Sequence, residues 1–372
     1  MVSDGCPGRF GWRCGGAVAY LWRMLRRLAA VLLPLALLAP LAAQDKPAPN
    51  KDTLAPFRPM LGTWTGQGTA MFNVEGEPSK WHGRATFSLC LDGKFVQEDI
   101  QLHFEGVPMP IHMRGYLGWD EAHARHAAIV VTSAGEVGLH KVKVLPDGTL
   151  LQVMNQEQDG VPYAERSLFK IHGDTMTHEI ELLMAQGASV PMVRGAFTRQ
   201  KADAQPCVVD GSGEPFLGMP PQADIGRLGK VAGSYKTEGE VATAPGQPRM
   251  KIAADERFEA WFGGGVVTGL TKGTAVGMPG TYESRAYWAY DKKSESLRCV
   301  YVSSMGEIGE MEGWWVGKQL VSVSAGRNAG QPMTQRFVLD FDEQGHAIAG
   351  RGHSMVGTAD PAETFKATYK RQ

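Results

Sequence analysis

Hydrophobic and polar residues alternate with a period of two through much of this chain. In residues 85–91 the odd positions carry Ala, Phe, Leu and Leu, while the even positions carry Thr, Ser and Cys. Residues 257–262 alternate in the same phase, which predicts that Phe258 is buried and Trp261 exposed. A period of two is typical of β-strands that bury one face and expose the other. The pattern therefore predicts a chain built from many short strands.

Turn signals separate these alternating segments. Pairs such as Asp92-Gly93 and Asp147-Gly148 follow them, and residues of this kind favour tight turns. A helical period is confined to two short stretches, residues 53–60 and 222–230. Many evenly spaced strands with little helix predict an all-β fold, either a sandwich or an up-and-down barrel.

The chain contains the same pattern twice at a constant offset. Leu61–Trp64 aligns with Ala232–Tyr235, and 235 − 64 = 171. Ser133–Gly138 and Ser304–Gly309 repeat that shift, so two copies of one fold are predicted. The predicted divisions are a first barrel repeat over residues 54–200, a linker over 201–224 and a second barrel repeat over 225–372. Each repeat is large enough to hold its own core.

The opening of each copy favours a barrel over a sandwich. Trp64 and Tyr235 are each preceded, two residues earlier, by a glycine that lets the chain bend inward, and a large ring there can plug the closed end of a barrel. Arg199 and Arg371 end the two copies, and the first and last strands are neighbours in a closed barrel. The predicted fold class is two tandem antiparallel up-and-down β-barrels, each plugged by a ring with an arginine stacked on it.

Residues 1–43 are predicted to be a signal peptide. The basic segment Arg23–Arg27 precedes an apolar run of about a dozen residues, which is too short for a membrane span and ends in small residues. Met24 is a candidate for the true start of the chain. We therefore expect an exported protein, periplasmic or secreted, with no membrane span after removal of this segment.

Charge makes nucleic acid an unexpected partner. Removal of residues 1–43 takes away five arginines and one aspartate, so the formal net charge changes from −1 to −1 − (5 − 1) = −5. A mildly acidic chain has no basic surface for phosphate backbones.

Enzyme and metal motifs are missing from the sequence. It contains no Gly-x-Ser-x-Gly elbow, Walker-type loop, Cys-x-x-Cys or His-Glu-x-x-His. His123 and His126 are three residues apart, but they occupy a predicted exposed hairpin loop, and no metal site or cofactor is expected. We therefore expect a protein that is not an enzyme.

Polar residues that both copies keep are the candidates for a role beyond packing. They are Arg114 with Arg285, Asp120 with Asp291, Ser133 with Ser304, and Glu136 with Glu307. Asp120 and Asp291 precede turns and are expected to cap them. Glu136 and Glu307 lie between glycines, where the backbone has room to turn a carboxylate into the barrel, or they lie on a solvated strand face. If they are buried, Arg114 or Arg285 would be the counter-charge.

The quoted residues resemble known families. Gly62-Thr63-Trp64 with a late arginine is similar to lipocalin and calycin barrels, and the motifs of both copies resemble the bacterial domain-of-unknown-function family number 1579. That resemblance implies a small, often exported, lipocalin-like barrel with no established activity. The opening Leu61–Gly68 also looks like that of nitrobindin-type barrels, which hold haem through a histidine. His178 is then the candidate, in one copy only.

Three functions remain open from the sequence. The first is non-enzymatic binding of a small apolar or amphipathic ligand inside a barrel, since barrels of this size can enclose one such molecule. The second is haem binding in one copy, and the third is a structural or protein-interaction module that uses the pair Trp314-Trp315. The oligomeric state is not predicted. The candidate ligand-lining residues are Phe87, Phe258, Tyr116, Tyr287, Glu136, Glu307, Arg114 and Arg285.

Overall fold

The computed structural model describes most of the chain beyond the predicted signal peptide. The described ranges are residues 52–71, 77–158, 161–184, 187–215, 221–242, 244–277, 280–328 and 331–372. All of them belong to one compact unit. The predicted signal peptide, residues 1–43, lies outside these ranges. No helix in the described part of the chain combines the length and the apolar character needed to cross a membrane.

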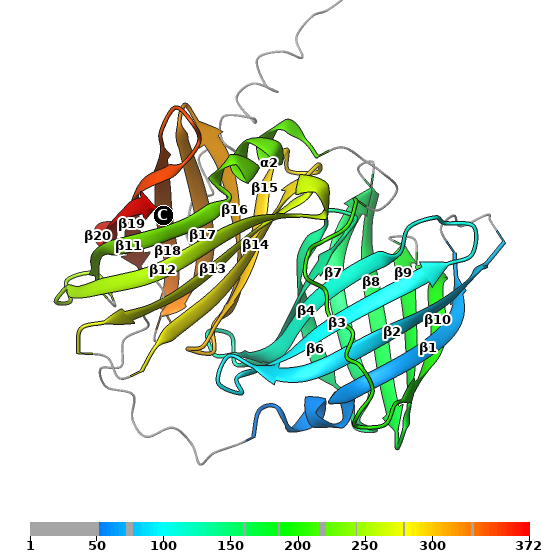
Figure 1. Ribbon diagram of the computed structural model, residues 1–372. Coiled ribbons are helices and arrows are strands. Elements are labelled where there is room, and N and C mark those ends of the chain that lie inside the picture. Colours follow the sequence, from blue (N-terminus) through cyan, green and yellow to red (C-terminus); the bar gives the residue numbers. More distant parts are fainter. Residues whose placement is uncertain are drawn as a thin grey trace, which may run out of the picture. The chain divides into compact units, whose positions relative to one another are not determined.

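The described residues form two closed antiparallel barrels of ten strands each, as the alternation and the repeat predicted. Each strand pairs with its neighbours in sequence, β10 returns to β1, and β20 returns to β11. Figure 1 shows each set of strands curled into its own barrel. The first barrel consists of β1 Gly62–Ala70, β2 Ser79–Cys90, β3 Phe95–Phe104, β4 Ile111–Asp120, β5 Arg125–Thr132, β6 Val137–Val144, β7 Leu150–Gln158, β8 Val161–His172, β9 Thr175–Met184 and β10 Ser189–Arg199. The second consists of β11 Gly233–Val241, β12 Met250–Trp261, β13 Val266–Ala275, β14 Tyr282–Asp291, β15 Ser296–Ser303, β16 Ile308–Val316, β17 Gln319–Asn328, β18 Gln331–Phe341, β19 Ala347–Val356 and β20 Ala362–Arg371.

Short helices precede both barrels, in the two stretches where a helical period was predicted. They are the 3₁₀ helix η1, Ala55–Met60, the α-helix α2, Ala223–Leu228, and the 3₁₀ helix η3, Gly229–Val231; a further 3₁₀ turn, η4, spans Phe262–Gly264. Phe57 and Met60 of η1 and Ile225 and Leu228 of α2 are buried. The helices therefore add apolar side chains to the two barrel cores.

Trp64 and Tyr235 are both fully buried and make equivalent hydrogen bonds. Trp64 Nε1 donates to the carbonyl oxygen of Met60 at 2.7 Å, and the Tyr235 hydroxyl donates to that of Val231 at 2.8 Å. Met60 and Val231 are themselves 171 residues apart. The offset in the sequence thus corresponds to the same local structure at the start of each barrel.

The predicted stacking of a late arginine is confirmed for Arg199 on Trp64, whereas Arg371 contacts the backbone just before Tyr235. The guanidinium carbon of Arg199 is 4.1 Å from the centre of the Trp64 ring, and Arg371 Nη2 donates to the carbonyl of Ala232 at 2.9 Å. Gly62 and Gly233 have φ angles of +120° and +144°, and a Cβ there would lie 3.2 and 3.0 Å from the arginine side chains. The glycines are therefore needed both for the backbone bend and for the close approach of arginine.

Two details of the predicted alternation are wrong. Leu89 is 46% exposed, because β2 ends at Cys90 and the chain turns at Leu91 and Asp92, which have positive φ. Trp261, predicted to be exposed, is only 6% exposed. Its ring packs against Phe262 and Tyr287. The prediction for Trp261 treated the outer face of the strand as exposed to solvent, whereas other side chains cover this part of the outer face.

Candidate functional site

A cavity of about 50 Å³ lies inside the second barrel. One buried water needs only ~10–15 Å³. Side chains of β12–β15, β17, β18 and β20 line the cavity, together with Leu228 from α2. Most of the lining is apolar or aromatic, with a few polar groups among it. A lining of this kind is typical of small-molecule sites.

Strand alternation decides which side chains face the cavity. On β14, Tyr282, Ser284, Ala286 and Trp288 line it, because successive side chains of a strand point to opposite faces. The intervening residues of β14 point away from it. Leu228 reaches the cavity from α2, which packs against β13, β14 and β15. The cavity is therefore bounded by the strands and by this short helix.

Glu256 is the charged residue of the cavity lining, and it is 3% exposed. Its Oε1 atom is buried and has no hydrogen-bond partner among the described residues. Burial raises the pKa of Glu256 to about 7, with the neighbouring Thr237 hydroxyl acting in the opposite direction. A carboxyl group with a free oxygen thus faces an otherwise largely apolar space.

A second carboxyl, Glu307, lies close to this interior. It accepts a hydrogen bond from the Ser303 hydroxyl at 2.7 Å, and its Oε1 is buried without a partner in the part of the chain that the structure describes. Burial raises the pKa of Glu307 to about 8, against the effect of Ser303. Burial also raises the pKa of Tyr282, and the charges of Glu307 and Glu256 add to that effect. Ser303, the donor to Glu307, is paired with Ser284 of the cavity lining, so Glu307 lies near the cavity wall.

Four polar residues of the cavity lining belong to the second copy alone. At the offset of 171, Glu256, Thr271, Tyr282 and Ser284 correspond to Ala85, Ile100, Ile111 and Met113. The strand registers agree, since Glu256 pairs with Thr271 as Ala85 pairs with Ile100. All four residues of the first copy are apolar and belong to, or pack against, its core. A barrel of this kind therefore folds without a carboxyl at this position.

The first barrel has a buried carboxyl at another position. Glu98 is 3% exposed, and its Oε2 is without a hydrogen-bond partner in the described ranges. Burial, together with the neighbouring Asp99, raises the pKa of Glu98 to about 7. Gly269, at the matching position of the second copy, lines the cavity. The two barrels thus differ in where they place a carboxyl.

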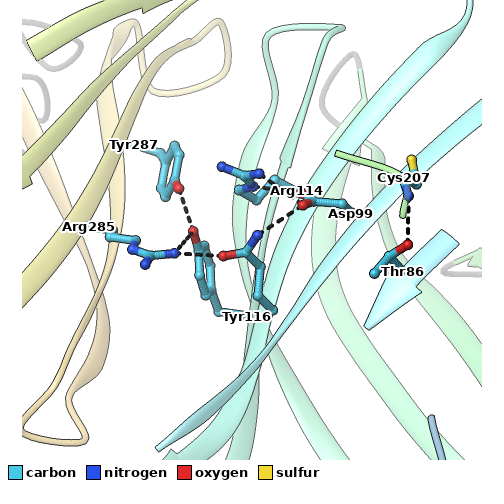
Figure 2. Close-up of polar contacts among 8 residues, drawn as sticks. Thr86, Asp99, Arg114, Tyr116, Cys207, Arg285 and Tyr287 are labelled. Atoms are coloured by element: carbon cyan, nitrogen blue, oxygen red, sulfur yellow. Dashed lines mark hydrogen bonds and ion pairs between the residues drawn. The ribbon is translucent and has the colours of Figure 1, made fainter. Parts of the chain in front are cut away.

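The predicted lining residues are divided between interior and exterior. Phe258 lines the cavity of the second barrel, and Phe87 is buried in the core of the first. Tyr116 and Tyr287 lie on outer strand faces, and their hydroxyls form a hydrogen bond of 2.7 Å. Figure 2 shows the two rings with this bond between them. The prediction that these tyrosines face an interior is wrong, because the phase of β4 and β14 turns them outward.

The predicted counter-charges are wrong for the same reason. Arg114 donates to both carboxylate oxygens of Asp99, at 2.7 and 2.9 Å. Arg285 donates to Gln97 Oε1 at 2.6 Å and to the Tyr116 hydroxyl at 3.1 Å (Figure 2). It also pairs with Glu283 at 3.0 Å. Neither arginine forms an ion pair with Glu136, which is exposed, or with Glu307.

The other polar residues that both copies keep support turns and strand ends. Asp120 Oδ1 accepts from the backbone N–H of His123 at 3.2 Å, and Asp291 Oδ1 accepts from that of Lys293 at 2.9 Å. The hydroxyls of Ser133 and Ser304 each accept a backbone N–H at 3.0 Å, 21 residues earlier in the chain. Hydrogen bonds to the backbone therefore explain why both copies keep these aspartates and serines.

The candidate histidines His123 and His126 are each engaged in a hydrogen bond with a protein group. His123 bonds to Asp120 at 2.7 Å, and His126 bonds to the carbonyl of Thr53 at 2.8 Å. Within the described ranges, no group of three or more His, Cys, Asp and Glu side chains is placed to hold a metal ion. The ring of His178 stacks on Phe169 with 4.1 Å between centres, and its Nε2 is closed off from solvent. That nitrogen has no hydrogen-bond partner among the described residues, so haem binding through His178 stays a prediction for the first copy.

The tryptophan pair considered for protein contacts is partly covered. Trp315 lies beneath Arg227 of α2, whose guanidinium carbon is 3.8 Å from the ring centre. Its Nε1 donates to the carbonyl of Asp224 at 3.2 Å, and its ring is 5.0 Å from that of Phe341. Trp315 therefore fastens α2 to the second barrel.

Sequence reasoning missed Glu256, Tyr282 and Tyr301, three of the polar residues that line the cavity. The comparison of the copies had looked for polar residues that both share. A search for positions where a buried strand face changes from apolar to polar between the copies would have found Glu256 opposite Ala85.

Comparisons with known proteins agree with the repeat. The family model described as "Protein of unknown function (DUF1579)" matches residues 47–199 and again residues 220–371. No curated protein sequence matches the chain. Among solved structures, the crystal structure of Rv2717c from M. tuberculosis is 15% identical, with a TM-score of 0.31, over 41% of this chain and 99% of that one.

A second solved structure, from Nostoc punctiforme, is a protein of unknown function from the DUF3598 family. It is 12% identical, with a TM-score of 0.25, over 87% of this chain and 100% of that one. Matches with TM-scores this low support no conclusion about fold or function.

Proposed function

The chain belongs to the family of proteins of unknown function DUF1579, and from that premise we propose that its second barrel binds a small, largely apolar molecule without transforming it. The family brings no activity with it, so the proposal depends on the interior of this barrel. The observation that carries it is the cavity in which Glu256 Oε1 lacks a partner among the described residues. The ligand would place its apolar part against the aromatic walls and one polar group at Glu256.

Energetics support a binding role for this carboxyl. Burying a polar group without a hydrogen bond costs roughly 1–3 kcal/mol in proteins, and burying an unpaired charge costs more. Ala85 occupies the same position in the first barrel, so the fold does not require this cost. A ligand that donates a hydrogen bond to Glu256 would recover part of it. Ligand-binding sites commonly keep buried polar groups that only the ligand pairs with.

Binding can be measured at Trp288, which lines the cavity. We expect the ¹⁹F resonance of Trp288, in protein labelled with 5-fluorotryptophan and assigned with a Trp288→Phe variant, to shift saturably on addition of benzyl alcohol. This probe combines one ring with one polar group, which matches the aromatic and acidic lining of the cavity. The Trp64 resonance, assigned with Trp64→Phe, serves as the control because Trp64 lies in the first barrel.

A Trp288 resonance that stays in place up to the solubility limit of benzyl alcohol would show that the cavity does not admit such a molecule. Equal shifts at Trp64 and Trp288 would point to general solvation of the protein, and this result would also contradict the proposal.

We also propose that the protein works outside the cytoplasm, periplasmic or secreted. Support comes from residues 1–43, with their basic start, short apolar run and small residues before Gln44. The intact mass of protein purified from its own host is expected to correspond to a chain that starts near Gln44. A mass that retains residues 24–43 would contradict export by cleavage.

A further inference from the structure

The lining of the cavity is acidic and aromatic. Glu256 is its ionisable acid, and the described residues that line it include no lysine, arginine or histidine. Six aromatic side chains contribute to the wall: Phe258, Tyr282, Trp288, Tyr301, Phe337 and Tyr369. An anionic ligand would meet an acidic group and no positive charge. Anions are therefore disfavoured as ligands of this cavity.

A neutral ligand leaves the charge of Glu256 uncompensated. A hydroxyl group could donate a hydrogen bond to Oε1, but a buried carboxylate would still lack a positive partner and would have to keep its proton. A ligand with a positive charge would compensate the carboxylate and also satisfy its free oxygen. Hydrogen bonds between ionised partners are stronger than those between neutral ones.

Glu307 adds a second acidic group to the same surroundings. Glu307 accepts a hydrogen bond from Ser303, and Ser303 is paired on the neighbouring strand with Ser284, which lines the cavity. Arg285, the arginine of β14, points to the other face of that strand and pairs with Glu283. Two carboxyls near one cavity, with no basic side chain in its lining, favour a cation.

The aromatic side chains of the cavity wall also favour a cationic ligand. The face of an aromatic ring attracts a cation through its quadrupole, and this attraction is larger when both are shielded from water. The same rings also pack against the apolar part of an organic ligand. Carboxylate and rings together fit a molecule with one positive group on a small apolar body.

We propose that the cavity of the second barrel selects small organic cations, with a protonated amine at Glu256 and the apolar part against the aromatic wall. This inference rests on the proposed function, because it assigns the ligand class of the same cavity. Metal ions are a poorer fit, since one carboxyl and an aromatic wall supply too few oxygen ligands for a hard cation.

Three probes of one size separate charge from shape. Benzylamine, benzyl alcohol and benzoate share a benzyl or phenyl group, and at pH 7 they are cationic, neutral and anionic. Their dissociation constants are read from the ¹⁹F resonance of Trp288 in the full mature chain. We expect benzylamine to bind about tenfold or more tightly than benzyl alcohol, as a charged hydrogen bond implies, and benzoate not to bind.

Glu256→Gln tests the assigned partner. We expect it to weaken benzylamine binding by about tenfold or more and benzyl alcohol binding by less than about threefold. Glu98→Gln is the matched control, since Glu98 is equally buried but lies in the first barrel, and it should change neither value. Near-ultraviolet circular dichroism checks that each variant is folded. If Glu256→Gln does not fold, the wild-type ranking of the three probes decides.

The outcomes separate the two proposals. Benzyl alcohol binding as tightly as benzylamine, or both weakening equally in Glu256→Gln, overturns the cation inference and leaves the binding function standing. Failure of all three probes to shift Trp288 overturns the binding function itself.

Discussion

Replacing Trp64 with alanine is expected to lower the free energy of unfolding by about 3–5 kcal/mol. Trp64 is fully buried, and its loss leaves a cavity at the closed end of the first barrel. It also removes the donor to the Met60 carbonyl and the ring beneath Arg199. Urea denaturation followed by far-ultraviolet circular dichroism measures the change. This is the largest effect that we expect from one substitution.

Leu89→Ala is the control for this prediction. Leu89 belongs to the same barrel but is 46% exposed, so its truncation is expected to change stability by less than about 0.5 kcal/mol. Trp64→Phe should fall between the two, because it keeps most of the buried ring and loses the hydrogen bond of Nε1. A loss of less than about 1 kcal/mol in Trp64→Ala would show that the ring does not stabilise the barrel.

Glu256→Gln is expected to make the protein more stable at pH 8 and to leave its stability nearly unchanged at pH 4.5. The pKa of Glu256 is raised from 4.5 to about 7 in the folded protein, mainly by burial. The folded state then holds the proton more tightly than the unfolded state, so stability falls as pH rises from about 4.5 to about 7 and is level above that. Glutamine has no proton to lose, and the variant avoids this decline.

The expected gain at pH 8 is roughly 3 kcal/mol, from the free energy that corresponds to such a pKa change. Urea denaturation of both proteins across pH 4.5–8 gives the difference. Glu98 and Glu307, whose pKa values are also raised, lower the stability of both proteins alike, so they cancel. Glu238→Gln, an exposed change on β11, is the control and should stay within about 0.5 kcal/mol of wild type. A difference that does not vary with pH would mean that Glu256 is not buried as described.

Sequence reasoning predicted the architecture because the relevant signals are local and repeated. Alternation specified strands, the offset of 171 specified two copies, and the glycines before Trp64 and Tyr235 specified the plugged ends. Each signal reflects a constraint that both copies meet independently, such as the approach of Arg199 over Gly62.

The interior of the second barrel could not be predicted in the same way. Alternation identifies two faces of a strand but does not say which one faces inward when both are buried. On β14, Trp288 lines the cavity while Tyr287 is buried on the opposite face, and both are aromatic. Glu256 belongs to no motif, and Ala85 stands at the matching position of the first copy, so the residues that both copies share do not include it.

Native mass spectrometry of the protein purified from its own host, with Glu256→Gln prepared in parallel, shows whether the second barrel holds a ligand at Glu256. We expect a small molecule bound to the wild-type protein and strongly depleted in the variant. A wild-type protein that carries no added mass, or equal adducts on both proteins, would contradict it.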